Sequence, residues 1–215
     1  MTPDSTSRSP RPDDGGRAAG TEPPGLRERI LSAAGALLVG EGYASLSMRR
    51  IAAEVGCTAT SIYLHFENKD ALVHALIEHG MEELHEALRQ VVETEPDPRR
   101  RLAGLCRAYL DFGLANPKYY EVMFLLHPER MARYPQEKYR RARRNLEFFA
   151  EAITELGGAD PTLSSVLVWC LLHGFLSLRL SGRLDAHLDP DRLADEAVSR
   201  VFQLIQPAPT SPSQP

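Results

Sequence analysis

Residues 46–69 constrain the fold of this chain more than any other stretch, because two short amphipathic segments flank a glycine there. Ser47 precedes an apolar series at helical spacing and Gly56 follows it, as expected for the start and the end of a helix. Thr58 is a second candidate N-cap, and Ile62 gives the next segment an inward residue. Helices this short need a neighbour to pack against. The stretch therefore predicts a helix-turn-helix, a motif whose second helix enters the major groove of DNA.

The rest of the chain has helical periodicity and no strand pattern, which predicts an all-α fold. A first helix is expected at residues 24–39 and a long one from Asn68 to Val92. Asp-Pro pairs at residues 97, 160 and 189 suit the cap and first turn of three further helices. The predicted organisation is a three-helix domain over residues 25–70 and a larger helical domain over residues 71–206, between tails at 1–24 and 207–215 that are too poor in apolar side chains to order.

Composition says more about the cellular environment expected for the protein than about its activity. The formal net charge of −4 does not by itself mark a nucleic-acid binder, so the motif carries that inference. The three cysteines are widely spaced and predict neither a disulfide framework nor a zinc site. Residues 163–180 are apolar on almost all sides, but they include His173 and Arg179, and a helix buried in a core and an interface explains them better than a membrane span. With no signal peptide pattern, we expect a cytoplasmic protein that does not bind membranes.

The motif resembles that of the TetR/AcrR (tetracycline-repressor-like) family of transcriptional regulators. The resemblance covers residues 26–72 and depends on several spacings at once, those of Gly56, Tyr63, Phe66 and Lys69. It implies a homodimeric regulator, usually a repressor, in which the helix-turn-helix domain precedes an effector-binding and dimerisation domain. The implied partners are double-stranded DNA with a near-palindromic operator, a small-molecule effector and a second copy of the chain, without a cofactor.

By the same resemblance, the exposed face of the second motif helix reads DNA. The positions that match the family's DNA contacts are Ser47, Arg49, Thr58, Ala59, Thr60, Ser61, Tyr63, His65 and Lys69. An arginine pairs naturally with guanine, so Arg49 is either a base reader or a phosphate contact or solvated charge. Tyr63 is either a phosphate contact or a half-buried aromatic. The family more often has a bulkier or basic residue in place of Ala59 and glycine in place of Thr60, so the base preference stays open.

The C-terminal half contains Trp169 followed by His173-Gly174, which resembles the Trp…His-Gly signature of the family's WHG-type C-terminal domain. The candidate effector-binding residues are Tyr109, Phe112, Phe149, Trp169 and His173. They imply a largely apolar effector with one polar anchor. For His173, a ligand contact and a satisfied position in the core are both open. Helices at 161–181 and 190–206 are expected to form the dimer interface, with Leu176 and Leu180 as candidates.

Enzymatic and metal-binding functions find little support in the sequence. The signatures of serine hydrolases, P-loop proteins and dinucleotide enzymes do not occur, so we expect no enzymatic activity. Glu82-x-x-His85, with Glu78 one turn before it, resembles half of a di-metal site, which needs a second such motif on another helix. A solvated helix face explains it better, and no metal is predicted. The alternative from another class is a helical small-molecule or metal-binding protein without a DNA-reading function.

Overall fold

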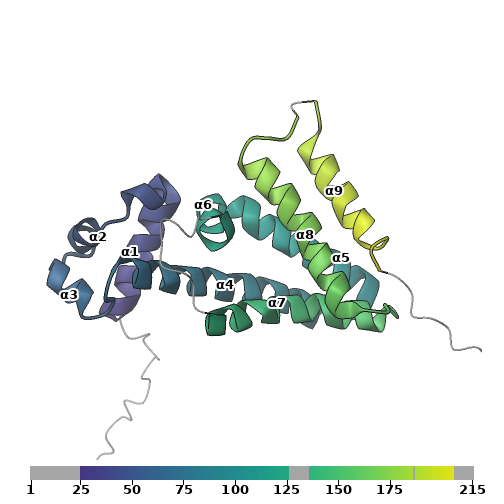
Figure 1. The fold of residues 1–215 in the computed structure, drawn as a ribbon, viewed down its shortest axis with the longest axis horizontal. Coiled ribbons are helices and arrows are strands. Elements are labelled where there is room, and N and C mark those ends of the chain that lie inside the picture. The colour runs from purple at the N-terminus through teal and green to yellow at the C-terminus, as the bar shows by residue number, and fades with distance from the viewer. Residues whose placement is uncertain (1–24, 126–135, 186, 206–215) are drawn as a thin grey trace, which may run out of the picture.

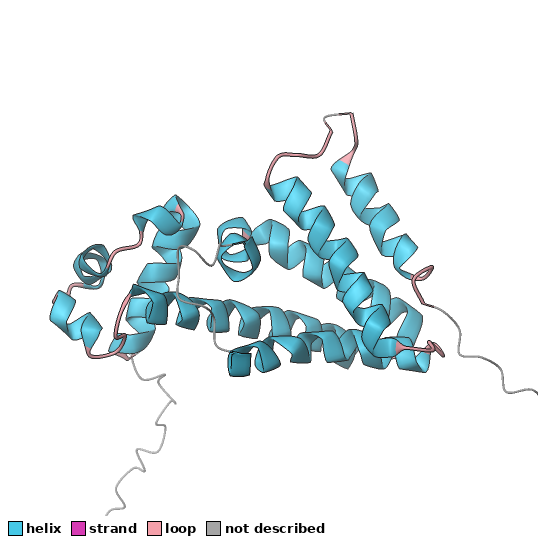
Figure 2. Cartoon of the chain, in the orientation of Figure 1, coloured by secondary structure: helices cyan, strands magenta, loops and turns pink. Residues whose placement is uncertain are grey.

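The computed structural model describes residues 25–125, 136–185 and 187–205, and over these ranges the chain is helical with no strand. The elements are α1 (Leu26–Glu41), the 3-10 turn η1 (Tyr43–Ser45), α2 (Met48–Val55), α3 (Ala59–Tyr63), α4 (Lys69–Thr94), α5 (Pro98–Ala115), α6 (Pro117–Tyr120), the π-helical turn η2 (Glu121–Leu125), α7 (Gln136–Glu155), α8 (Pro161–Leu180) and α9 (Pro190–Val201). The all-α prediction is confirmed, and the two predicted tails lie outside the described residues (Figures 1 and 2).

Local signals in the sequence set the helix ends. The Ser47 side chain accepts a hydrogen bond from the Arg50 amide at the start of α2. Gly56 ends α2 in the left-handed conformation, with φ of 73°, which glycine adopts at little cost. The predicted Asp-Pro starts are confirmed as well, because Asp97, Asp160 and Asp189 each accept from a backbone amide in the first turn of α5, α8 and α9.

The first of two hydrophobic cores joins α1, α2 and α3 to the beginning of α4. Ile30, Leu38, Ile51 and Ile62 are fully buried in it, together with α4 residues as far as Ile77. This burial is what holds α2 and α3, which are too short to be stable alone. The long helix α4 leaves this bundle and continues into the rest of the molecule (Figure 1).

The second core lies between the later part of α4 and α5, α7, α8 and α9 (Figure 1). Leu84 and Leu88 carry α4 into it, so the same helix is buried in both cores. The short helix α6 also touches both, because Tyr119 belongs to the first core and Tyr120 to the second. Gly80 allows α6 and η2 to lie against α4, since a Cβ atom there would stand 2.7 Å from the Tyr119 ring.

Candidate nucleic-acid interface and internal cavity

The second motif helix, α3, presents one side to the first core and the other to solvent. Ile62 is fully buried and Phe66, just beyond the helix, is nearly so. Thr60 and His65 are exposed, and Tyr63 is 53% exposed. An exposure of 53% fits both readings of Tyr63, the phosphate contact and the half-buried aromatic, so both stay predictions.

Three of the candidate DNA-binding residues also contribute to the fold of the motif, two as helix caps and one by packing on the first core. Thr58 caps α3: its Oγ1 accepts from the Ser61 amide at 3.1 Å and lies 2.8 Å from the Ser61 hydroxyl. The two hydroxyls therefore already bond to each other. Ser47 caps α2 in the same way, and Ala59 is partly buried against the first core. On α3 and in the turn that follows it, the candidates with unoccupied outward polar groups are Thr60, Tyr63 and His65.

The two adjacent arginines at the start of α2 differ in their surroundings. Arg50 forms an ion pair with Glu41 at the end of α1, and that carboxylate raises the pKa of Arg50. Arg49 is exposed, and no ion pair or hydrogen bond holds its side chain within the part of the chain that the structure describes. Arg49 is therefore the arginine that is available to a base or a phosphate.

Lys69 lies at the start of α4 and is packed against η1. Its Nζ donates to the Tyr43 carbonyl at 3.3 Å and lies 3.9 Å from the centre of the Tyr43 ring. Partial burial lowers the pKa of Lys69 below its usual value of 10.5. The cation is thus held against the turn between α1 and α2, a position that the sequence did not indicate.

Leu64 is a surface residue that the sequence analysis did not include among the DNA-binding candidates. It follows α3 directly and is 82% exposed, more than any other large apolar side chain described. The spacing of Thr60 and Leu64, one helical turn apart, places both on the outward face. Thymine methyl groups are natural partners for an apolar side chain on such a face. The candidates that the resemblance gives on this face are small, hydroxyl-bearing or aromatic residues, so Leu64 is not among them.

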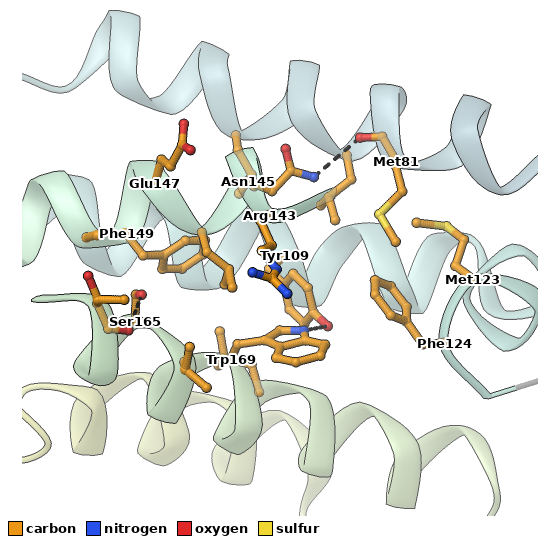
Figure 3. Close-up of a pocket in the computed structure, with 17 residues that line it drawn as sticks. Met81, Tyr109, Met123, Phe124, Arg143, Asn145, Glu147, Phe149, Ser165 and Trp169 are labelled. Atoms are coloured by element: carbon orange, nitrogen blue, oxygen red, sulfur yellow. Dashed lines mark hydrogen bonds between the residues drawn. The ribbon is translucent and has the colours of Figure 1, made fainter. Parts of the chain in front are cut away.

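A cavity of about 700 Å³ lies in the second core (Figure 3). Its wall comes from α4, α5, η2, α7 and α8 and consists of Met81, Leu84, Leu88, Tyr109, Met123, Phe124, Arg143, Asn145, Leu146, Glu147, Phe149, Ala150, Thr162, Ser165, Val166, Trp169 and Leu172. The volume is in the range of small-molecule sites, and most of the wall is apolar or aromatic, as is usual for them.

Three of the five predicted effector-binding residues line this cavity: Tyr109, Phe149 and Trp169. Phe112 is buried in the second core but is not part of the wall. His173 is also absent from the wall, one helical turn beyond Trp169 on α8. Phe112 was predicted from apolar helical spacing, which identifies the buried side of a helix without distinguishing a cavity from solid packing. His173 was predicted from the Trp…His-Gly resemblance, which does not specify whether the histidine faces a cavity.

His173 ends a chain of hydrogen bonds that begins at the cavity. The Trp169 indole donates to the Tyr109 hydroxyl at 2.9 Å, and this hydroxyl lies 2.9 Å from that of Tyr120. The Tyr120 hydroxyl lies 2.6 Å from Nδ1 of His173. Burial lowers the pKa of His173 and raises those of Tyr109 and Tyr120. With all three groups neutral, each hydroxyl donates to the next acceptor and His173 accepts at the end.

The remaining sequence features contribute no metal site. His85 contacts Asn145, with 2.7 Å between Nδ1 and Oδ1, and Glu82 forms an ion pair with Arg144 on α7. Within the described ranges, no group of three or more His, Cys, Asp or Glu side chains is arranged to hold a metal ion. The Glu82-x-x-His85 pattern therefore serves contacts between α4 and α7.

One face of α8 is apolar and uncovered in the protomer. Leu163, Leu167 and Leu178 are each at least 41% exposed, and a Cβ atom on Gly174 would have no neighbour within 4 Å. By length and composition alone, α8 is apolar enough to cross a membrane. Leu176 is fully buried against Gly113 of the same chain, and Leu180 packs on the second core. The expectation that Leu176 faces a partner is therefore wrong, because it lies on the inward side of α8. Leu180 is partly exposed, and its place in the interface stays a prediction.

These observations define the class of the protein: an all-α chain whose N-terminal helix-turn-helix is joined by one continuous helix to a larger helical domain with a partly open cavity. The family model for bacterial regulatory proteins of the tetR family matches residues 30–76. The model for the tetracyclin repressor-like C-terminal domain matches residues 102–201. The chain belongs to the TetR family of transcriptional regulators.

Individual relatives are more distant. The chain is 30% identical over 115 residues to the HTH-type transcriptional activator FasR of Mycolicibacterium smegmatis, a match that covers 53% of this chain and 52% of FasR. The chain thus spans about half the length of the curated relatives it matches. A protein of unknown function from Rhodococcus sp. RHA1 is similar in structure, with a TM-score of 0.73, 25% identity and coverage of 87% of this chain and 99% of that one.

The fold is also that of AibR, solved in complex with isovaleryl coenzyme A and operator DNA. The TM-score is 0.61 at 24% identity, and the alignment covers 83% of this chain and 98% of AibR. At this identity the likeness shows the fold alone.

Proposed function

We propose that the protein is a ligand-responsive, DNA-binding transcriptional regulator and not an enzyme. The observation that carries the proposal is the outward face of α3 and of the turn after it, where Thr60, Tyr63 and His65 are exposed on a motif fixed by its caps and by the first core. The free guanidinium of Arg49 adds a group suited to guanine or phosphate. With Lys69, Arg49 is a basic residue of this surface in a chain whose formal net charge is −4.

The protein acts in this proposal as a homodimer, with the apolar face of α8 against its symmetry mate. Leu163, Leu167 and Leu178 would be covered there, and the open space beside Gly174 allows two helices to approach closely. A two-fold dimer presents two copies of α3 to one side of the duplex, which calls for a near-palindromic operator. It also gives the apolar surface of α8 a partner other than lipid, in keeping with a cytoplasmic protein.

Effector binding in the cavity would release the operator, which is the action of a repressor. Two elements link the cavity to the first core: α4, which is buried in both, and α6, whose adjacent tyrosines belong to one core each. Met81 and Met123, near the point where these elements meet, are in the cavity wall. A ligand that shifts either element changes the position of both reading helices. By linkage, such an effector binds the DNA complex more weakly by the same factor by which it weakens DNA binding.

The test is binding of the purified protein to DNA around its own gene, measured by fluorescence anisotropy and mapped by footprinting. We expect a protected near-palindrome and a dimer by sedimentation. Leu167→Glu should give monomers with intact helical content, because Leu167 is exposed in the protomer. A wild-type monomer at micromolar concentration that still binds DNA would contradict the dimer. Absence of any preferred DNA site in a genome-wide footprint would contradict the regulatory function.

A further inference from the structure

Arg143 brings a positive charge to a cavity that is otherwise mainly apolar. Its side chain is exposed, is part of the wall, and points from α7 toward Tyr109 and Trp169 in Figure 3. Glu147 stands one turn further along α7 and is the one carboxylate of the wall, but in Figure 3 it points away from Trp169. The next residue, Arg144, is paired with Glu82. Among the described residues, Arg143 forms no ion pair, with Glu147 or with any other carboxylate.

Most of the neutral polar side chains of the wall already have hydrogen-bond partners within the protein. Asn145 uses its oxygen for His85 and its amide nitrogen for the Met81 carbonyl, at 2.7 Å and 3.3 Å. Tyr109 and Trp169 bond to each other and continue into the chain that ends at His173. Ser165 donates to the carbonyl of Thr162 at 2.8 Å. A ligand therefore meets a surface whose neutral donors are mostly occupied, and the guanidinium is the charged donor still available.

We propose that the cavity binds an amphipathic organic anion, with its apolar body among Leu84, Phe149 and Trp169 and its acidic head on Arg143. The proposal rests on the proposed function only in taking this cavity as the effector site. A guanidinium presents parallel donors that match the oxygens of a carboxylate, sulfonate or phosphate, and such charge-assisted bonds are about twice as strong as neutral ones. Arginine keeps its charge at any physiological pH, so a neutral ligand that covers Arg143 would bury an unpaired cation. The same residue thus favours anions and disfavours neutral analogues.

Two fluorescent probes with one ring system separate charge from apolar burial. Anilinonaphthalene sulfonate carries an anionic group that phenylnaphthylamine lacks. The chain contains a single tryptophan, Trp169, and it lies in the cavity wall, so energy transfer from it to either probe reports binding nearby. The sulfonate should bind the wild type at least about tenfold more tightly than the neutral probe.

Matched variants test whether Arg143 is the residue that causes the preference for the sulfonate. Arg143→Met should abolish the advantage of the sulfonate, because it weakens binding of the sulfonate and leaves binding of phenylnaphthylamine equal or stronger, and Arg143→Lys should keep part of the advantage. Arg144→Met is the control, since this neighbour is not part of the wall and its pairing partner is Glu82. Equal affinity of the two probes for the wild type, a preference that survives Arg143→Met, or no energy transfer with either probe would each overturn the proposal.

Displacement of the sulfonate then identifies the acidic head. Decanoate and decyl phosphate share a chain length, and stronger displacement by one assigns a carboxylic acid or a phosphoryl head. Displacement by decanol as effective as by both acids would contradict an anion site. The assay contains no DNA. Loss of operator binding would therefore refute the regulatory function and leave the probe preference standing, whereas loss of the preference would refute the anion site and leave DNA binding untouched.

Discussion

The DNA-reading surface and the cavity are built in different ways. The surface comes from one continuous stretch, in which inward residues such as Ile62 supply stability and outward residues such as Thr60 are free for contact. The cavity wall is collected from five elements between Met81 and Leu172, and many of its residues are also core residues. On the DNA-reading surface, different residues therefore provide stability and recognition. In the cavity wall, the same residues provide both.

Phe149→Ala is the strongest test of this difference. Phe149 is 3% exposed and lines the cavity, so its loss should cost about 3–5 kcal/mol of unfolding free energy and also reduce binding of apolar probes. Thr60→Ala, on the outward face of α3, should change stability by about 0.5 kcal/mol or less. Chemical denaturation measures both. If the two variants lose similar stability, Phe149 does not stabilise the second core more than an exposed residue stabilises the motif.

The adjacent arginines at the start of α2 sharpen the comparison within the reading surface. Arg49→Ala should weaken binding to the specific site by about 1–3 kcal/mol if the side chain reads a guanine. Arg50→Ala is the matched control, because Arg50 is already paired with Glu41. Anisotropy on the operator and on a variant of it with the guanine replaced measures the effect. If Arg49→Ala lowers affinity equally on every sequence, Arg49 contacts phosphate instead of a base.

The same contrast explains which parts of the molecule could be predicted from sequence. The caps at Ser47 and Thr58 and the turn at Gly56 depend on neighbours within a few residues, so spacing was enough to locate them. The inward position of Leu176 depends on which side of α8 meets α5, and the place of His173 depends on Tyr120 from α6. Such contacts join segments that are distant in the sequence. The helical periodicity of one segment does not predict which residues of the other segment it contacts.

Lys69 tests whether a residue of the reading surface can also have a packing role. Lys69→Ala should weaken binding to all sequences alike and reduce the slope of log affinity against log salt by about one, as expected for one lost phosphate contact. It also removes the contact with Tyr43, so a small loss of stability should accompany it. An unchanged salt slope together with reduced stability would assign Lys69 to packing alone.

The smallest expected effect concerns pH and the chain of hydrogen bonds behind the cavity. Burial lowers the pKa of His173 in the folded protein below its ordinary value of 6.5. As the pH falls below that value, the unfolded chain takes up a proton at this residue before the folded protein does, and the free energy of unfolding decreases. The loss continues until the pH reaches the lowered pKa and then levels off.

Stability is therefore fully present above about pH 6.5 and declines as the pH falls below it. Protonation also places a hydrogen on Nδ1, which then cannot accept from Tyr120, so the chain through Tyr109 to Trp169 loses its last acceptor. His173→Gln keeps an acceptor and does not titrate in this range. Denaturation curves from about pH 8 to about pH 5 should thus be steeper in pH for the wild type than for the variant. Parallel pH profiles would mean that His173 is not kept neutral by the fold.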